Sequence, residues 1–247
     1  DVPYQHLIAK PYLEAGIPCY ISRPFAYNLR DIDTLLEAAA KNDTPICATA
    51  KYEHYKEVPG LKRKMENIGN IKLVQASACT YDFPIHFHIQ FMMLQILGMD
   101  VKQVSMFCDN SMKASYVHET YLYEGKEGQS PYLCTIDGAR LPESFDITIF
   151  GDKANASANF LREYETEHDW EYKLYFRYAP QILDMQRTFE GRNYEPYDNV
   201  RKKTEIFLTA FYSYTERGGA PVDVGTVPMD WRVGPPYIHQ NTDKFPG

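Results

Sequence analysis

The first fifty residues alternate between helix-like and strand-like segments, and this rhythm constrains the fold more than any other feature of the sequence. Apolar residues recur at helical spacing over 4–15 and 29–43, and short apolar runs follow at 18–22 and 44–50. Such alternation predicts βαβ units with parallel strands. The first visible element is a helix, and two strands are too few for a doubly wound sheet. We therefore expect further strands of this sheet to precede Asp1.

The pattern changes after a predicted helix at 57–69, because strand-like segments bounded by turn residues now dominate. An apolar helical segment at 88–98 and a long amphipathic helix at 198–219 interrupt them. The strand-like segments are 70–82, 101–110, 130–140, 144–152, 155–163 and 169–177. A series of antiparallel strands after an α/β segment predicts a second domain built on an open sheet.

The predicted fold class is therefore α/β plus α+β, in three parts. Residues 1–56 form the C-terminal half of a parallel α/β sheet. Residues 57–230 form an α+β domain with an open, mostly antiparallel sheet and flanking helices. Residues 231–247, rich in proline and glycine, form a C-terminal tail over the surface.

Composition excludes several classes of function. The net charge is −7 and the basic residues are scattered, with the densest run at 62–64, so we expect no nucleic-acid partner. No segment is long and apolar enough to span a bilayer, so we expect no membrane association. The five cysteines lie far apart without a Cys-x-x-Cys pair, which is typical of small buried apolar residues in a reducing compartment. The expected location is cytoplasmic, with export left open.

Arg23 and Pro24 end the apolar run at 18–22 abruptly. In open α/β sheets ligands bind at the carboxyl ends of the strands, and proline would fix the turn that aims the preceding side chain. Arg23 is thus a candidate site residue. The alternative is a surface arginine before a proline that starts a helix.

His86 and His88 lie two residues apart, so in an extended segment both would point to one face. Imidazole titrates near neutrality, and either ring could exchange a proton with a substrate hydroxyl. Two ligands are too few for a closed metal site and no acidic or cysteine cluster adjoins them, so we predict no metal. The alternative is a polar pair that caps the helix at 89–97.

Four segments in this order resemble the glucose–fructose oxidoreductase and inositol dehydrogenase (Gfo/Idh/MocA) family. The first contains a histidine at a helix start, a glycine, a strand and a basic residue before proline. The four segments are "DVPYQHLIAKPYLEAGIPCYISRPFAYNLRDIDTLLEAAAKNDTPI", "IHFHIQFMMLQILG", "FDITIFGDKANASANF" and "EIFLTAFYSYTERGGAPVDV". In that family a Rossmann domain precedes an open, mostly antiparallel sheet. The resemblance therefore implies that residues 1–56 are the C-terminal half of a Rossmann-type sheet, a partial dinucleotide-binding domain, and that residues 57–230 serve substrate binding and oligomerisation.

The resemblance implies roles for individual residues, and this sequence departs from the family pattern at two positions. Arg23 stands where the family has a lysine that contacts the substrate hydroxyl and helps proton transfer; arginine can position and polarise but does not readily act as a base. Aligning Gly98 with the family's helix-ending glycine puts His88 on the family histidine, with Phe91 at a usually polar position. A second register instead puts His86 on that histidine.

The resemblance also implies a nicotinamide cofactor, either NAD or NADP. Arg23, Pro24, His6, Lys51 and Tyr52 would face it, His6 beside the cofactor loop and the last two after the strand at 44–50. Tyr52 could equally be a packing aromatic, and His6 could be structural. No G-x-G-x-x-G occurs in these 247 residues, so the resemblance places the phosphate-binding turn before the first residue.

The function expected from the resemblance is an NAD(P)-dependent oxidoreductase acting on a sugar, polyol or related hydroxy compound. One alternative is a catalytically silent relative that serves as a binding or assembly subunit, favoured by Arg23 and Phe91. Another is non-redox sugar chemistry, by elimination or hydrolysis, with NAD retained. An exposed open sheet would be a large apolar patch, so we expect a homo-oligomer that buries it.

Overall fold

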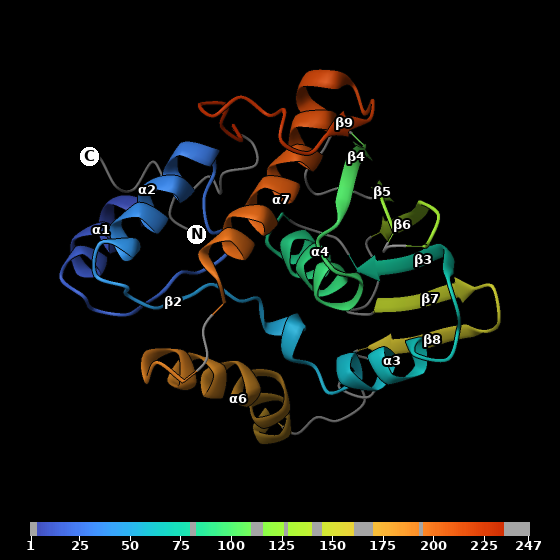
Figure 1. Cartoon of the computed structure of the whole chain (residues 1–247), viewed down its shortest axis with the longest axis horizontal. Coiled ribbons are helices and arrows are strands. Elements are labelled where there is room, and N and C mark those ends of the chain that lie inside the picture. The colour runs from blue at the N-terminus through green and yellow to red at the C-terminus, as the bar shows by residue number, and fades with distance from the viewer. Residues whose placement is uncertain are drawn as a thin grey trace.

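The computed structural model describes residues 4–79, 83–109, 116–125, 128–139, 145–160, 170–192 and 195–234. The helices are α1 (Gln5–Glu14), α2 (Leu29–Ala40), the 3-10 turn η1 (Lys51–His54), α3 (Glu57–Met65), α4 (Phe83–Leu97), α6 (Trp170–Phe189) and α7 (Tyr197–Arg217). Two sheets organise this part of the chain, and α4 and α7 lie between them (Figure 1).

The N-terminal sheet has two parallel strands, β1 (Cys19–Tyr20) and β2 (Ile46–Cys47). The helix α2 connects them, and α1 packs beside α2. Asn28 starts α2 by accepting a hydrogen bond from the backbone N–H of Asp31 at 2.7 Å, which satisfies one free donor of the first turn. The predicted parallel βαβ arrangement is confirmed, although each strand is only two residues long.

The second sheet has seven strands in the order β8-β7-β3-β6-β5-β4-β9. β3 and β6 pair in parallel and every other neighbouring pair is antiparallel, which confirms the predicted open, mostly antiparallel sheet. Its strands are β3 (Ile71–Cys79), β4 (Val101–Cys108), β5 (Tyr116–Tyr123), β6 (Tyr132–Ala139), β7 (Phe145–Gly151), β8 (Asn155–Phe160) and β9 (Val222–Asp223).

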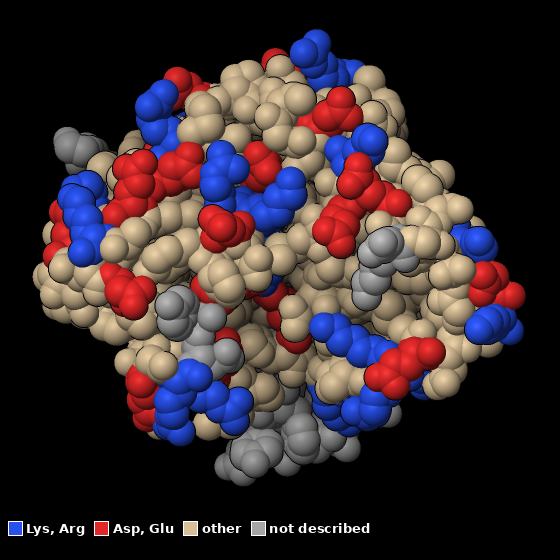
Figure 2. Space-filling view, viewed as in Figure 1, with Lys and Arg blue, Asp and Glu red and all other residues tan. Residues whose placement is uncertain are grey.

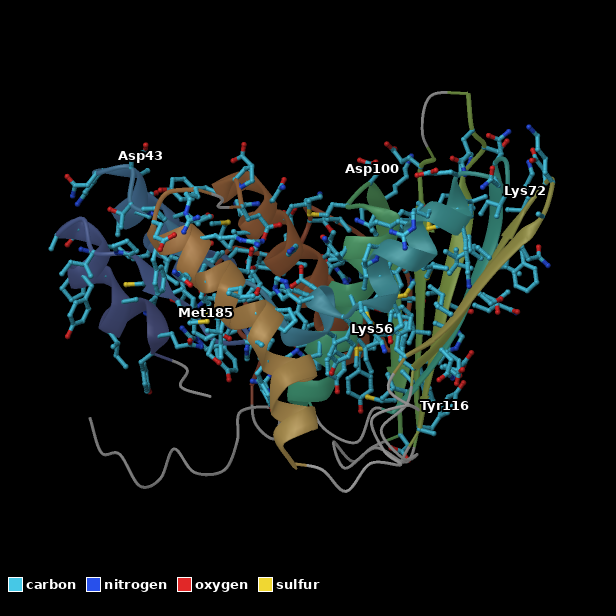
Figure 3. All side chains as sticks on the ribbon, turned by 90° about the horizontal axis from the view of Figure 1, so that it is seen from below. Asp43, Lys56, Lys72, Asp100, Tyr116 and Met185 are labelled. Atoms are coloured by element: carbon cyan, nitrogen blue, oxygen red, sulfur yellow. The ribbon has the colours of Figure 1, made fainter. Side chains whose placement is uncertain are left out.

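The described helices cover one face of this sheet, and none of them covers the other (Figure 3). Alternation along the strands matches this arrangement, since buried and more exposed residues alternate through β5. The helix α4 is apolar all round and lies in the middle of the core. α7 packs on both α2 and β4, so it joins the two halves of the molecule (Figure 1).

β7 ends where the backbone of another segment comes very close. A Cβ atom placed on Gly151 would lie 2.1 Å from the carbonyl oxygen of Ile68. That oxygen accepts hydrogen bonds from the backbone N–H groups of Lys153 and Ala154, so its position is fixed by the turn after β7. Only glycine fits here without displacing backbone.

Three local expectations were wrong. The segment 169–177 was expected to be a strand, but the structure has α6 from Trp170. Its aromatic residues favour strands, yet α6 continues to Phe189 and even contains Pro180, so tertiary packing outweighs local propensity. One face of the helix, with Gln181 and Thr188, is buried. The strand β5 was not anticipated at all.

The third correction concerns the two histidines. The helix α4 begins at Phe83, so His86 and His88 lie on a helix and not on an extended segment. Residues two apart on a helix point about 200° apart, and the expected shared face does not exist. Of the predicted tail, residues 231–234 are described; Val233 is buried and its N–H donates to the carbonyl of Tyr27 at 3.0 Å. The other tail residues lie outside the described part.

Candidate functional site

The carboxyl ends of β1 and β2 lie side by side, and the Arg23 turn follows the first of them. The Arg23–Pro24 peptide bond is cis, and the side chain of Gln5 donates to the Pro24 carbonyl at 3.0 Å. Phe25 is buried and packs edge-on against Phe87 of α4, with ring centroids 5.2 Å apart. The turn is therefore anchored directly after Arg23.

Two polar side chains join Arg23 at this edge. Gln181 of α6 donates both to the hydroxyl of Tyr20 and to the carbonyl of Thr49, each at 3.2 Å, and so connects the ends of the two strands. Burial raises the pKa of Tyr20, while the nearby positive charge of Arg23 acts in the opposite direction. Neither residue was predicted as part of the site: Tyr20 lies in the predicted strand at 18–22 without an assigned role, and Gln181 lies beyond the segment 169–177 that was expected to be a strand.

His88 of α4 lies against Tyr52, which belongs to the turn η1 after β2. Its ring stacks on Tyr52 with centroids 4.7 Å apart and planes at 24°, and Tyr52 stacks in turn on Tyr55. His88 is 3% exposed, so any proton exchange with a ligand requires local opening. Phe91 is fully buried against Phe25, which explains an apolar residue at that helix position.

The other candidates are distributed differently. His6 lies 3.4 Å from the carboxylate of Asp31, which also accepts from Arg232 at 2.6 Å. Burial lowers the pKa of His6. This position joins α1, α2 and the C-terminal segment, which fits a structural role. Lys51 lies in η1, and its side chain and that of His86 fall outside the described residues.

A charged cavity of about 260 Å³ adjoins the end of β2. Lys203 of α7 lies between two carboxylates there, 2.6 Å from Glu53 Oε2 and 2.9 Å from Glu195 Oε1. The remaining lining residues are Ile46, Cys47, Ala48, Thr49, His54, Gln95, Asp184, Thr188 and Pro196. Charged side chains from three distant segments thus meet beside η1.

The buried lysine stays charged. Its side chain is 4% exposed and that of Glu53 is 5% exposed. Burial acts to lower the pKa of Lys203, but the two carboxylates outweigh it and the pKa is raised overall. Glu53 also accepts from the backbone N–H of Ala50 at 2.7 Å, so the ion pair fixes the turn that carries Tyr52.

His54 gives this cavity a pH-dependent group. Its Nε2 lies 2.8 Å from the Thr49 hydroxyl, and burial lowers its pKa although Glu53 and Asp184 act to raise it. A lowered folded pKa means that the unfolded chain takes up the proton first. We therefore expect stability to fall as the pH drops from 6.5 through the lowered pKa, and the fall to be smaller in His54→Gln.

Thermal unfolding between pH 7.5 and pH 5 measures this effect. His118→Gln is the matched control, because His118 is part of the sheet face and its side chain is 38% exposed. If wild type and His54→Gln lose melting temperature equally across this range, the burial of neutral His54 does not contribute to the pH dependence.

Metal and membrane candidates are absent from the part of the chain that the structure describes. Within it, no group of three or more His, Cys, Asp or Glu side chains could hold a metal ion. Across the same residues, no helix combines the length and the apolarity needed to cross a bilayer. Acidic and basic side chains are interspersed on the face shown in Figure 2.

No protein-family model and no curated protein matches the chain. Solved structures do match. GenD2 from gentamicin A biosynthesis, in complex with NAD, is 13% identical with a TM-score of 0.72 over 90% of this chain and 76% of that one. A putative myo-inositol dehydrogenase from Sinorhizobium meliloti is 12% identical with a TM-score of 0.71 over 90% and 78%.

A third match is an oxidoreductase from Agrobacterium radiobacter in complex with NAD+, L-tartaric acid and magnesium. It is 15% identical with a TM-score of 0.67 over 91% of this chain and 78% of that one. The chain has the fold of the Gfo/Idh/MocA dehydrogenases. The fold-level resemblance inferred from the sequence is confirmed, and in this Gfo/Idh/MocA fold the Arg23 turn follows a parallel strand, as the quoted motif predicted.

Proposed function

We propose that this protein is an NAD(P)-dependent oxidoreductase acting on a sugar, polyol or related hydroxy compound. The observation that carries the proposal is Arg23 at the carboxyl end of β1, beside the end of β2. Ligands of open α/β sheets bind at such an edge. The dehydrogenase and oxidoreductase structures of the same fold support the class of reaction, and the L-tartaric acid in one of them is a hydroxy compound.

The residues at this edge suit the nicotinamide end of the cofactor. The Arg23 Nε atom is buried and has no hydrogen-bond partner among the described residues, so a donor is available to a ligand. Arg23, Pro24 and the segment after β2 with Lys51 and Tyr52 would hold this end. When bound, the nicotinamide supplies hydride transfer. A glycine-rich turn for the pyrophosphate does not occur in these 247 residues.

The protein side chains would divide the remaining work. Arg23 stays protonated at every usable pH, so it would orient and polarise the substrate oxygen. His88 would exchange the proton, provided that the Tyr52 stack opens. In the second alignment with the family motif, His86 takes the place of His88, and its role in proton exchange stays a prediction.

The test is nicotinamide absorbance at 340 nm with NAD+ and NADP+ across a panel of sugars, polyols and hydroxy acids. We expect turnover on at least one compound, and a large loss of kcat in Arg23→Gln with partial recovery in Arg23→Lys. Arg63→Gln, an exposed change on α3, controls for charge alone. Absence of turnover by wild type and by Arg23→Lys, despite cofactor binding, would overturn the oxidoreductase proposal.

A binding or assembly subunit is the second candidate. The observation that favours it is the burial of both His88 and Tyr52, since neither ring reaches an open cleft within the described structure. Such a protein would bind nicotinamide or a hydroxy compound without turnover. The same absorbance assay, paired with a calorimetric binding measurement, separates the two.

We also propose that the protein forms a homo-oligomer through the helix-free face of the large sheet. Phe107, Tyr116 and Leu133 are 54%, 42% and 45% exposed on strands that lie next to one another. Leu133→Lys is expected to shift the molar mass measured by light scattering to the monomer. Ile182→Lys, which changes an exposed residue of α6, should leave the molar mass unchanged. A mass unaffected by Leu133→Lys contradicts this interface.

A further inference from the structure

Arg23 differs from the other partly buried arginines in having no acidic partner among the residues that the structure describes. Within the described residues this class contains Arg23, Arg201 and Arg232. Arg201 donates to Asp33 at 2.9 Å, and Arg232 donates to Asp31 at 2.6 Å. No described carboxylate pairs with Arg23, and its Nε atom is buried without a hydrogen-bond partner among those residues. A half-buried guanidinium without a counter-charge or a hydrogen-bond acceptor destabilises the fold unless a ligand supplies them.

The neighbours that can be named are neutral. Tyr20 is close enough for the charge of Arg23 to influence its hydroxyl, and that hydroxyl bonds to Ser22 and Gln181. None of these three side chains can neutralise a guanidinium. Among the described residues, the neighbours that can be named for the Arg23 guanidinium are thus polar and uncharged.

We propose that Arg23 binds a carboxylate group of the substrate, so that the hydroxy compound is a hydroxy acid. This substrate assignment rests on the proposed function, whereas carboxylate binding at Arg23 can be tested without any turnover. A guanidinium presents paired N–H donors that match the two oxygens of a carboxylate, and such charge-assisted bonds are among the strongest in proteins. Lysine would offer the same charge without this geometry.

The surroundings favour a carboxylate over a phosphate. Phosphate sites draw on several backbone N–H groups, and Pro24 has none to give at this turn. On the next turn of α6 from Gln181, Asp184 faces the charged cavity with Glu53 and Glu195, where Lys203 is the only lysine or arginine in the described lining. That excess of negative charge repels a phosphate dianion more strongly than a single carboxylate.

Matched pairs of acid and alditol isolate the carboxylate. D-gluconate with D-glucitol, D-glycerate with glycerol, and L-tartrate with L-threitol share their carbon chain length and differ in oxidation at one or both ends. Binding is measured by calorimetry, and in parallel by the shift of the Arg23 Nε–H signal in nitrogen-15 NMR, which is assigned by its loss in Arg23→Lys. Inorganic phosphate is titrated as a competitor.

We expect at least one acid to bind about tenfold to a hundredfold more tightly than its alditol and to shift the Arg23 signal. Arg23→Gln should abolish the preference, Arg23→Lys should retain part of it, and Arg63→Gln should leave it intact. Equal binding of acid and alditol, a preference that survives in Arg23→Gln, tighter binding of phosphate than of every acid, or no acid binding at all would each overturn the assignment.

The two proposals fail separately in these measurements. If a carboxylate binds at Arg23 but no nicotinamide turnover occurs, carboxylate binding is supported and the oxidoreductase proposal is rejected. If the protein turns over an alditol and prefers no acid, the oxidoreductase proposal is supported and the assignment of a hydroxy acid is rejected.

Discussion

Lys203→Met is expected to lower the free energy of unfolding by roughly 3–5 kcal/mol. The substitution removes the ammonium group that lies 2.6 Å from Glu53 and 2.9 Å from Glu195, and leaves both carboxylates buried without their counter-charge. Within the described part of the chain, Glu53 would keep the hydrogen bond from the backbone N–H of Ala50 alone. Urea unfolding followed by circular dichroism measures the loss.

Two variants make this result specific. Lys202→Met changes the adjacent lysine, which is 37% exposed and pairs with Glu205 at 3.2 Å, and it should cost less than about 1 kcal/mol. Combining Lys203→Met with Glu53→Gln and Glu195→Gln removes the unpaired charges, and it should recover most of the stability. If Lys203→Met costs no more than Lys202→Met, the buried ion pairs do not stabilise the fold.

Gly151→Ala is expected to destabilise the protein by about 3 kcal/mol, the upper part of the range for overpacked sites. The new methyl group would lie 2.1 Å from the Ile68 carbonyl oxygen, which is backbone and cannot rotate away. Either the turn after β7 shifts and weakens the hydrogen bonds to that oxygen, or the strand end separates from the residue 68 backbone. The same unfolding measurement applies.

Gly60→Ala provides the matched comparison. Gly60 lies inside α3, and the nearest atom to its new methyl would be the end of the flexible Arg63 side chain at 3.9 Å. Alanine is the better helix former, so this variant should gain up to about 1 kcal/mol. Equal stability of the two variants would mean that the approach of β7 to Ile68 relaxes without cost.

Local signals in the sequence located the framework of the site. The helix–strand rhythm and the proline after Arg23 are short-range features, and they placed the turn correctly at the end of β1. The alignment on Gly98 also placed His88 in α4, where it meets Tyr52. Both inferences need only neighbours along the chain or one motif of fixed length.

The charged cavity could not be predicted in the same way. Lys203 and Glu53 are 150 residues apart, and nothing in either segment marks its side chain as buried. Their meeting is a tertiary effect, since it depends on how the start of α7 is placed beside η1. Gln181 was not predicted either, because its role depends on α6 reaching the ends of β1 and β2, and the aromatic start of that helix has strand propensity.

The position of α7 has a consequence for synthesis on the ribosome. Residues 197–217 pack on α2 and β4 and carry the lysine that neutralises Glu53, and β9 then pairs with β4. The backbone of Val233 finally bonds to Tyr27. Each half of the molecule thus lacks packing partners until residues 197–233 have left the exit tunnel. A nascent chain halted before α7 should therefore be digested readily by protease and held by chaperones, while release of α7 should protect both halves together.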